Sequence, residues 1–319
     1  MADQMPRKVF VVGGAGFIGS HLVDRLAESC IVTVYDDLSS GSQQFIEHHQ
    51  GSSRFRFVQA DVLDYDTLYE AMDGHDVVFH LAANPDARSS VADTRLDLRI
   101  GTLATFNVLE AMRLHGIRKL VFSSSGMVYG EPPFVPLSES YGPLLPISLY
   151  GASKLASEGL ISAFCHTFGL QAWVFRFANI VGGRATHGVA FDLIGKLRKD
   201  PTQLEVLGDG KQEKSYVLVD DCVDAVLYGV EHSTNEVNLF HIGCDSTTDV
   251  ATIADMVIEE MGLNGVKKVF TGGERGWRGD VPLMKLDVGK LNALGWCARW
   301  TSTEAVGMAI RRILGKPDD

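Results

Sequence analysis

Short apolar runs rich in β-branched residues alternate with helical patterns through the first half of this 319-residue chain. An apolar run without polar alternation is typical of a strand buried on both faces. Such strands, separated by helices, indicate a parallel sheet covered by helices on both sides. We therefore predict an α/β fold with a doubly wound parallel sheet. The expected strands are 8–12, 31–35, 55–59, 77–81, 119–123 and 173–177, with helices at 17–28 and 102–113.

The pattern changes after residue 179. A loop begins at Gly182, a helix is expected at 191–199, and a strand and turn at 206–210 and 211–219. The run 237–242 can rejoin the sheet, and helices are expected at 250–261 and 301–314. We predict a dinucleotide-binding domain at 1–178, rejoined by about 217–245. A smaller, discontinuous substrate-binding part is expected at 179–216 and 246–319.

Gly13, Gly16 and Gly19 form a Gly-x-x-Gly-x-x-Gly pattern between the first expected strand and the first expected helix. Glycine lets the backbone approach a pyrophosphate closely, and the N–H groups of a helix N-terminus bind its charge. A simple tight turn is the other interpretation of three glycines. The placement between strand and helix favours a dinucleotide-binding, Rossmann-type unit.

The second expected strand ends in Tyr35-Asp36-Asp37. An acid at this position accepts hydrogen bonds from the adenosine ribose and repels a 2′-phosphate. No arginine directly follows it, so we expect NAD as the cofactor rather than NADP. Asp61, after the third strand, has two interpretations: it meets the adenine edge, or it is the N-cap of a helix over 63–71.

Tyr150 and Lys154 lie four residues apart in a helical pattern, so the ammonium group can lie beside the phenol. A phenol normally loses its proton near pH 10. A nearby cation lowers the pKa of tyrosine and makes it a usable general acid/base. A Tyr–Lys pair is also common on exposed helix faces, and its meaning depends on the other motifs of the chain.

Composition excludes several classes of function. The net charge of −11 argues against a general nucleic-acid or anionic-membrane binder. No apolar run approaches the roughly 20 residues that span a bilayer, and the first residues lack the apolar core of a signal peptide. We therefore expect a cytoplasmic protein with no membrane partner and no nucleic-acid partner.

The five cysteines and ten histidines show no metal-ligand spacing. The cysteines are scattered, and we expect reduced, mostly buried thiols. No His-x-x-x-His pair occurs, and His48-His49 lies in a polar stretch where solvated side chains are expected. We predict no metal site.

Further motifs follow in a fixed order, and together they resemble the extended short-chain dehydrogenase/reductase family, specifically its nucleotide-sugar epimerases and dehydratases. The resemblance covers the chain from Lys8 to about Leu314. The motifs are the glycine turn with Asp36, Asp61-Val62, His80-Leu81-Ala82-Ala83, Ser123-Ser124-Ser125, Tyr150-x-x-x-Lys154, Arg176-Phe177-Ala178-Asn179, Leu207-Gly208-Asp209-Gly210 and Gly279-Asp280-Val281-Pro282. Asn179-Ile180-Val181-Gly182, His187-Gly188-Val189 and Gly276-Trp277-Arg278-Gly279-Asp280 suggest the subgroup of 4-epimerases that act on UDP-glucose and UDP-galactose.

The resemblance implies roles for particular residues. Ser125, Tyr150 and Lys154 would be the catalytic set, with Lys154 also bonding the nicotinamide ribose. The cofactor-binding residues would be Gly13, Gly16, Phe17, Ile18, Gly19, Asp36, Asp37, Asp61, Val62, Leu81, Ala82, Ala83, Ser123, Tyr150, Lys154 and Phe177. The substrate-binding residues would be Ser125, Tyr150, Asn179, Val189, Lys214, Arg275 and Asp280.

The implied reaction is NAD-dependent epimerisation at C4 of a nucleotide-activated hexose through a transient 4-keto sugar. The related 4,6-dehydratases typically carry Asp and Glu directly after the serine, where this chain has Gly126 and Met127. Neither residue can donate or accept a proton, so elimination of water is disfavoured. A dehydrogenase or ketoreductase of the same family stays open, as does an epimerase of a UDP-N-acetylhexosamine, a UDP-hexuronate or a GDP- or CDP-sugar.

Other departures from the family leave substrate contacts open. Gly101 stands where the family often has Asn, and Lys214 where many relatives have Arg. Either Arg275 or Arg278 covers the diphosphate. Met284 leaves open whether an N-acetyl group is admitted. Arg88 either meets a substrate anion or forms a surface ion pair.

The resemblance also implies a homodimer. The helical segments after the fourth strand and over 150–168 carry apolar stripes, and in the resembled family such helices pair into a four-helix bundle across a two-fold axis. The same stripes would also suit helices that pack on their own sheet.

Overall fold

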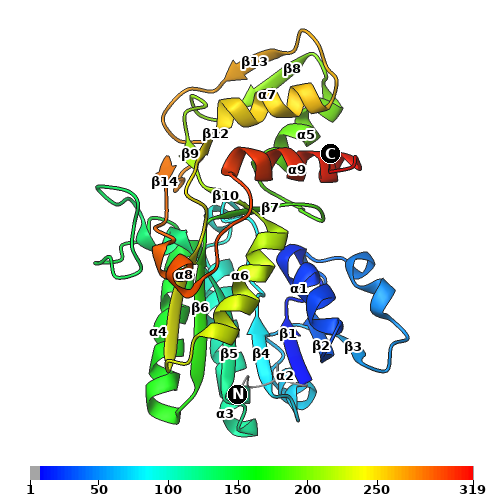
Figure 1. The fold of residues 1–319 in the computed structure, drawn as a ribbon, viewed down its shortest axis with the longest axis vertical. Helices are drawn as coiled ribbons and strands as arrows, with labels where there is room; N and C mark the ends of the chain where they lie inside the picture. Colours follow the sequence, from blue (N-terminus) through cyan, green and yellow to red (C-terminus); the bar gives the residue numbers. More distant parts are fainter. Residues whose placement is uncertain (1–7, 319) are drawn as a thin grey trace. The chain divides into compact units, whose positions relative to one another are not determined.

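A seven-stranded sheet forms the centre of the first compact unit in the computed structural model, which describes residues 8–318 (Figure 1). Its strand order, β3-β2-β1-β4-β5-β6-β11, is that of a doubly wound Rossmann sheet. The pairs β1–β2, β1–β4, β2–β3 and β4–β5 are parallel. The prediction of a doubly wound parallel sheet is confirmed. The strands are β1 (Lys8–Val12), β2 (Ile31–Asp36), β3 (Phe55–Gln59), β4 (Val77–His80), β5 (Lys119–Ser125), β6 (Gln171–Phe177) and β11 (Val237–Ile242).

Helices pack on both faces of this sheet, which explains why its strands read as continuous apolar runs. On β6, Ala172 and Val174 join the core beneath the helices of one face. Phe175 points the other way, where a Cβ on Gly229 would lie 2.9 Å from its ring. The helices are α1 (Phe17–Ala27), α2 (Tyr65–Met72), α3 (Ala104–His115), α4 (Leu149–Phe168) and α6 (Val219–His232).

The second compact unit has a separate core, built by three helices around short strands. Apolar side chains of α5 (Val189–Lys199), α7 (Val250–Glu260) and α9 (Ser302–Leu314) bury residues of β8 (Gln203–Val206) and β10 (Tyr216–Leu218). Thr301 forms a capping box with Glu304 and starts α9. The remaining elements are β7 (Asn179–Val181), β9 (Glu213–Lys214), β12 (Thr248–Asp249), β13 (Lys267–Phe270), β14 (Leu283–Met284) and α8 (Gly289–Leu294).

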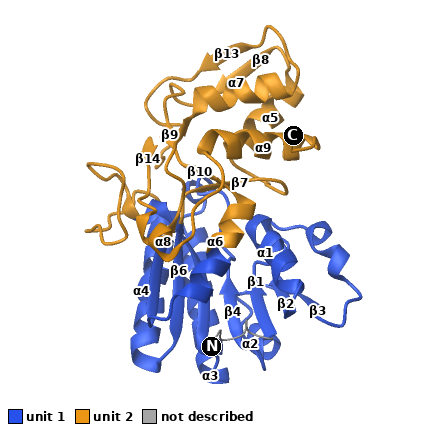
Figure 2. Ribbon diagram, viewed as in Figure 1, with its two compact units in different colours: residues 1–128, 149–176, 226–240 blue, residues 129–148, 177–225, 241–319 orange. Residues whose placement is uncertain are grey.

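The two compact units interleave along the chain (Figure 2). Unit 1 comprises residues 1–128, 149–176 and 226–240, and unit 2 comprises 129–148, 177–225 and 241–319. Residues 129–148 and 217–225, which the sequence analysis assigned to the dinucleotide-binding domain, thus fall in unit 2. The sequence-based domain boundaries stay a prediction, and their first seven residues lie outside the described part of the chain.

Two local expectations are corrected. The strand expected at 206–210 ends at Val206, because Gly208 and Gly210 have φ values of +77° and +80° and turn the chain. The helix expected over 63–71 begins at Tyr65. Its N-cap is Asp64, whose side chain accepts the N–H of Thr67.

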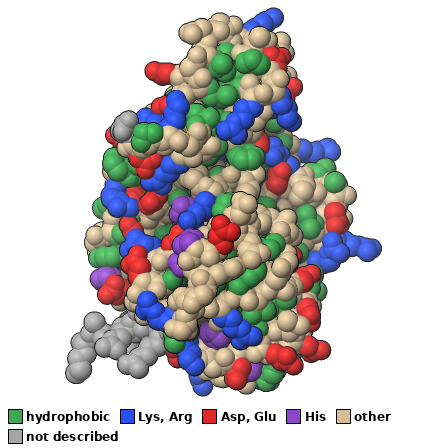
Figure 3. Space-filling model, turned by 90° about the vertical axis from the view of Figure 1, so that its right-hand side faces the viewer, with side chains coloured by type: hydrophobic (Ala, Val, Ile, Leu, Met, Phe, Trp, Pro, Cys, Tyr) green, Lys and Arg blue, Asp and Glu red, His purple; other side chains and the backbone are tan. Residues whose placement is uncertain are grey.

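Further features of the structure concern helix length, surface charge and the cysteines. Among the described residues, no helix is long and apolar enough to cross a membrane. On the face shown in Figure 3, acidic and basic side chains are interspersed. Four of the five cysteines are buried and all five are free; Cys297 is exposed.

Candidate active site

The glycine turn between β1 and α1 brings three backbone segments into close contact. Gly13 has φ +81°, and a Cβ there would lie 2.5 Å from the backbone nitrogen of Ala82. A Cβ on Gly19 would lie 2.0 Å from the Gly13 carbonyl oxygen. Gly16 is the N-cap of α1 and provides no side-chain cap, so the first amides of the helix, from Phe17 on, point out of the turn. The close backbone and the open amides suit a phosphate group.

Asp36 lies at the end of β2, beside this turn. Its two carboxylate oxygens accept the N–H groups of Ala15 and Leu38, each at 2.9 Å. Burial raises the pKa of Asp36, and the two backbone hydrogen bonds oppose that shift. Each oxygen keeps a lone pair for a ribose hydroxyl. Asp37 is exposed, and its carboxylate accepts two hydrogen bonds from Ser39.

Asp61 is not a helix N-cap, and that interpretation is wrong. Its carboxylate accepts the N–H of Leu63 at 2.9 Å in a local turn, and its backbone carbonyl accepts the hydroxyl of Tyr35. Asn107 of α3 donates to the carbonyl of Val62. The interpretation of Asp61 as an adenine contact stays a prediction.

The residues that follow β4 contact the end of β1, the strand that leads into the glycine turn. The N–H groups of Leu81 and Ala82 both donate to the carbonyl of Val12, at 2.8 and 3.0 Å. Ala83 follows them as a half-buried residue. Leu81 and Ala82 therefore lie beside the glycine turn.

Ser125, Tyr150 and Lys154 lie together at the carboxyl end of β5 and the start of α4. Tyr150 and Ser125 share a side-chain hydrogen bond. The Nζ of Lys154 lies 5.8 Å from the centre of the Tyr150 ring, and it donates to the carbonyl of Ser123 at 2.6 Å. The spacing argument is confirmed in that the ammonium group lies beside the phenol.

The predicted direction of the tyrosine pKa shift is not found in the protein itself. Burial raises the pKa of Tyr150 to about 12, the carboxylate of Asp97 adds to that rise, and the hydrogen bond from Ser125 opposes it. Burial lowers the pKa of Lys154 to about 8, against the carboxylates of Glu158 and Asp97. Both groups are shifted towards their neutral forms, because burial penalises charge on each of them.

A buried ion pair that the sequence analysis missed supports this group. Glu158, one turn after Lys154 on α4, accepts hydrogen bonds from Ser124 at 2.5 Å and from Arg176 at 2.6 and 3.0 Å. The pair links α4, β5 and β6. The sequence pattern that could have pointed to Glu158 is its i, i+4 spacing from Lys154.

A second missed group surrounds Asp97, which is buried. Its carboxylate accepts hydrogen bonds from Ser90 and from the amide of Asn84, the latter at 3.1 Å. Asp97 acts electrostatically on both Tyr150 and Lys154. No spacing pattern in the sequence points to it, because the three residues come from an irregular segment.

Gly101 occupies a π-helical turn, Leu98–Leu103, directly before α3. A Cβ on Gly101 would lie 2.6 Å from the hydroxyl oxygen of Ser153, which neighbours Lys154. The asparagine that the family often has at this position does not fit unless Ser153 moves. A π-helical turn is often found at functional sites.

The predicted substrate residues of unit 2 form an ion-paired cluster. Lys214 and Asp280 pair at 2.5 Å, and the second oxygen of Asp280 accepts the N–H of Gly276. Arg275 donates to the backbone carbonyl of Asp280 at 2.6 Å and pairs with Glu131. Lys214, Arg275 and Asp280 therefore lie together.

Three further residues predicted to bind cofactor or substrate lie at the ends of strands or helices. Phe177 ends β6 and is buried. Asn179 begins β7, and its side chain donates to the carbonyl of Ser215 at 3.3 Å. Val189 is the first residue of α5.

Arg88 forms a two-point ion pair with Asp86, at 2.8 and 2.9 Å, as one of its two interpretations predicted.

Known proteins define the class of this fold and site. Residues 9–243 match the model of the NAD dependent epimerase/dehydratase family. A UDP-glucose 4-epimerase of Mycolicibacterium smegmatis is 36% identical over 263 residues, covering 76% of this chain and 84% of the relative.

Solved structures agree with this class. A UDP-galactose 4-epimerase has 38% sequence identity and a TM-score of 0.86, with 96% of this chain and 98% of that chain covered. A UDP-glucuronic acid 4-epimerase from Bacillus cereus, solved with UDP-glucuronic acid and NAD, has 26% identity and a TM-score of 0.86, with 97% and 99% covered.

The chain therefore belongs to the NAD-dependent epimerase/dehydratase family, within the extended short-chain dehydrogenases/reductases. It is an isomerase of the NAD-dependent nucleotide-sugar 4-epimerase type. The open amides of α1, the glycine turn and the Asp36 carboxylate fit NAD.

Proposed function

We propose that the enzyme interconverts UDP-glucose and UDP-galactose by inverting C4 of the hexose. The hydrogen-bonded Ser125–Tyr150 pair, with Lys154 beside it, is the observation that carries the proposal. Similarity to enzymes named for UDP-glucose and UDP-galactose supports the choice of sugar and nucleotide.

Tyr150, in its phenolate form, removes the proton of the C4 hydroxyl, and the same residue returns it to the 4-keto sugar. Ser125 holds the reacting oxygen through its hydroxyl. Lys154 supplies positive charge beside the phenol and bonds the nicotinamide ribose. NAD, when bound, would supply the hydride acceptor and donor for C4, and its positive ring would be a second positive charge that lowers the pKa of Tyr150.

The backbone that follows Ser125 supports epimerisation over dehydration. Gly126 and Met127 form the start of a 3₁₀ turn, Gly126–Tyr129, and the N–H of Met127 donates to the Ser125 hydroxyl oxygen at 3.2 Å. Neither side chain can move a proton. The 4-keto sugar therefore meets no acid or base there that would eliminate water.

Binding roles follow the predicted sets. The glycine turn and the first turn of α1 hold the pyrophosphate, and Asp36 holds the adenosine ribose. Lys214 and Arg275 offer positive charge to the sugar-nucleotide diphosphate, and Asp280 bonds its ribose. The remaining predicted cofactor and substrate contacts are Asp37, Asp61, Val62, Leu81, Ala82, Ala83, Ser123, Phe177, Asn179 and Val189.

A second candidate substrate is UDP-glucuronic acid, because a structure that contains it covers 97% of this chain. A panel of UDP-, GDP-, CDP- and dTDP-sugars, incubated with the enzyme and resolved by chromatography, tests both. Conversion of UDP-glucose to UDP-galactose without added NAD supports the proposal. If only UDP-glucuronic acid is converted, it is the substrate in place of UDP-glucose. Net formation of NADH would show that the enzyme oxidises the sugar and does not epimerise it.

The Tyr150→Phe variant tests the assigned chemistry. It removes the acid/base oxygen and keeps the ring, so turnover should fall at least 1,000-fold, within the roughly 10²–10⁴-fold range of general acid–base catalysis. The variant should still bind NAD, measured by fluorescence. Substantial activity in this variant would refute the role of Tyr150.

We also propose a homodimer through α3 and α4. Exposed apolar side chains on α3 include Phe106 and Leu114, and Leu103 directly precedes the helix. On α4 the exposed residues Leu149, Ala152 and Ala156 share one face.

A cytoplasmic location likewise stays a prediction, based on the scattered free cysteines.

A further inference from the structure

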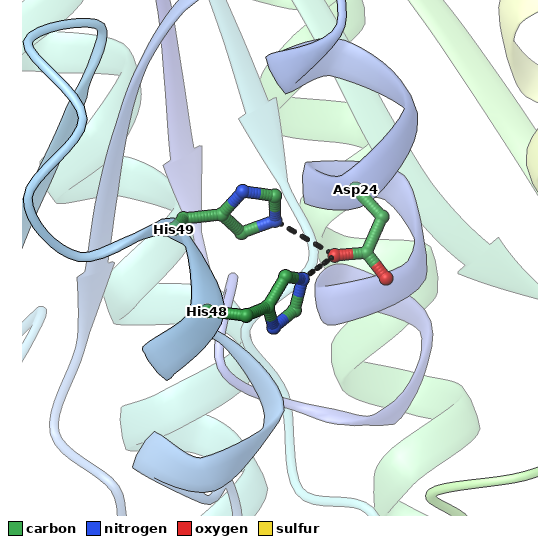
Figure 4. Close-up of side chains that lie close together, drawn as sticks. All are labelled: Asp24, His48 and His49. Atoms are coloured by element: carbon green, nitrogen blue, oxygen red, sulfur yellow. Dashed lines mark hydrogen bonds and ion pairs between the residues drawn. The ribbon is translucent and has the colours of Figure 1, made fainter.

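Three potential metal ligands converge on the outer side of α1 (Figure 4). Asp24 lies on α1, and His48 and His49 form the end of a short 3₁₀ turn, Glu47–His49, in the connection between β2 and β3. The Nε2 atoms of His48 and His49 lie 2.9 and 2.8 Å from the same oxygen, Oδ1 of Asp24. The expectation of solvated side chains holds for His48, which is 49% exposed, and is corrected for His49, which is only 16% exposed.

If only hydrogen bonds hold Asp24, His48 and His49 together, the protonation of both imidazole rings is fixed. An ionised carboxylate only accepts hydrogen bonds, so both rings must carry their proton on Nε2 and share one oxygen. The two rings are also close, with centroids 4.0 Å apart. A cation among the three atoms would instead use the Nε2 lone pairs and the carboxylate as ligands, with the ring protons moved to Nδ1.

The donor set and its dimensions suit a tetrahedral divalent metal. Two imidazole nitrogens and one carboxylate oxygen, completed by water, form a common zinc ligand set. Zinc–ligand distances of about 2.0–2.2 Å put tetrahedral ligands roughly 3.3 Å apart. The two imidazole nitrogens now lie 2.9 and 2.8 Å from Oδ1 of Asp24, and all three atoms lie within 4.8 Å of one another, so the three groups must shift slightly to reach that spacing. His48 is 49% exposed and leaves a solvent path for the fourth ligand.

The cluster lies between two segments that flank the glycine turn. The connection after β2 is already tied to that turn, because the N–H of Ser42 donates to the carbonyl of Ala15 at 2.9 Å. Ile46, between the two short turns of this connection, is fully buried. A metal at Asp24 would add a further link between α1 and the segment 43–49.

We propose that Asp24, His48 and His49 bind a divalent transition-metal ion of the Zn²⁺ type and that the ion fastens the β2–β3 connection to α1. The ion lies outside the catalytic group of Ser125, Tyr150 and Lys154. The ion joins two segments of unit 1, and hard ions such as Mg²⁺, which prefer oxygen ligands, bind this donor set more weakly.

Metal binding by the full-length, tag-free protein tests the proposal. After treatment with EDTA and buffer exchange, Zn²⁺ is titrated by calorimetry, and Co²⁺ by visible absorption in the 550–650 nm region. We expect one ion per chain with a Kd of about 10 μM or lower, and a Zn²⁺-dependent rise in the thermal midpoint. Mg²⁺ should produce neither effect. Absence of Zn²⁺ uptake would overturn the proposal and leave the three side chains as a hydrogen-bonded cluster.

Variants assign the ion to this cluster. His48→Gln and Asp24→Asn should each weaken Zn²⁺ binding at least tenfold and remove the rise in thermal midpoint. His166→Gln changes an exposed histidine of α4 that bonds its own helix at Ser162, and it should bind Zn²⁺ as the unchanged protein does. Midpoints in EDTA show that the variants fold. Undiminished binding in folded His48→Gln would place the ion elsewhere and refute the site.

Discussion

The Nζ of Lys154 lies 2.6 Å from the backbone carbonyl oxygen of Ser123. This contact fixes the ammonium group of α4 against the carboxyl end of β5, two residues before Ser125. One turn further along α4, Glu158 binds Ser124 and Arg176. The helix and the strand that supply Ser125, Tyr150 and Lys154 are thus joined by two successive sets of contacts.

Glu158→Gln should slow turnover without loss of substrate affinity. Gln keeps the shape but removes the charge that pairs with buried Arg176, which should cost about 3 kcal/mol of unfolding free energy. The Glu158 carboxylate also raises the pKa of Lys154. Its loss should move the alkaline limb of the kcat–pH profile to lower pH and reduce kcat about tenfold or more.

Glu205→Gln is the matched control. It breaks an exposed pair with Lys196 in unit 2, where a loss below about 1 kcal/mol and no change in the pH profile are expected. Urea unfolding and steady-state kinetics from pH 6 to pH 9.5 check both variants. A Glu158→Gln enzyme that is destabilised but keeps its kcat and pH profile would show that Glu158 serves only the fold.

Lys154→Met should change how stability depends on pH. Lys154 has a folded pKa of about 8, below its ordinary value of 10.5. Below pH 8 the folded protein bears the full cost of a buried charge. Between pH 8 and pH 10.5 the unfolded chain binds more protons than the folded one, so the unfolding free energy contributed by Lys154 rises with pH.

The measurement compares urea unfolding of the two proteins at pH 7.5 and pH 9.5. Relative to Lys154→Met, the unchanged protein should gain about 1–2 kcal/mol over this interval. Titrations of other groups cancel in the comparison. Equal pH dependence of the two proteins would mean that Lys154 does not lose its proton near pH 8.

The architecture of unit 1 was readable from the sequence because its strands are buried on both faces. Each expected strand of the first half lies in the sheet, and 237–242 joins it as β11 beside β6. The strand expected at 206–210 was misplaced, since Val206 is the end of β8 and two glycines with positive φ follow it. Apolar periodicity predicted the sheet and did not resolve a short strand next to a turn.

The site was predictable where chemistry depends on local spacing. The Tyr150–Lys154 arrangement follows from one helical turn, and the glycine turn from its place between strand and helix. The direction of the Tyr150 pKa shift was not predictable, because burial and the distant residue Asp97 determine it. The Asp24–His48–His49 cluster was also not predictable, because Asp24 is far from the two histidines in the sequence and meets them only after folding.

Asp280→Asn should raise the KM for the nucleotide sugar about tenfold and leave kcat within a factor of two. The substitution removes the charge that pairs with Lys214 and weakens the proposed bond to the nucleotide ribose. Asp255→Asn breaks another Asp–Lys pair of unit 2, with Lys268, in which Asp255 is largely exposed, and it should change neither constant. An unchanged KM in Asp280→Asn would remove Asp280 from the substrate site.

The proposed dimer can be tested with a matched pair of substitutions. Phe106 on α3 and Phe270 at the end of β13 are equally exposed, at 41% each. A charge at Phe106 would be buried in the proposed α3–α4 interface without a partner and would cost several kcal/mol of association free energy. Phe270 lies outside that interface, so a charge there should have no such effect.

In sedimentation equilibrium, the unchanged protein and Phe270→Glu should therefore be dimers, and Phe106→Glu should be a monomer. Far-ultraviolet circular dichroism of Phe106→Glu should match that of the unchanged protein, because Phe106 contributes a half-exposed side chain to its own unit. A dimer that persists in Phe106→Glu would place the interface elsewhere, and a monomeric unchanged protein would refute the dimer itself.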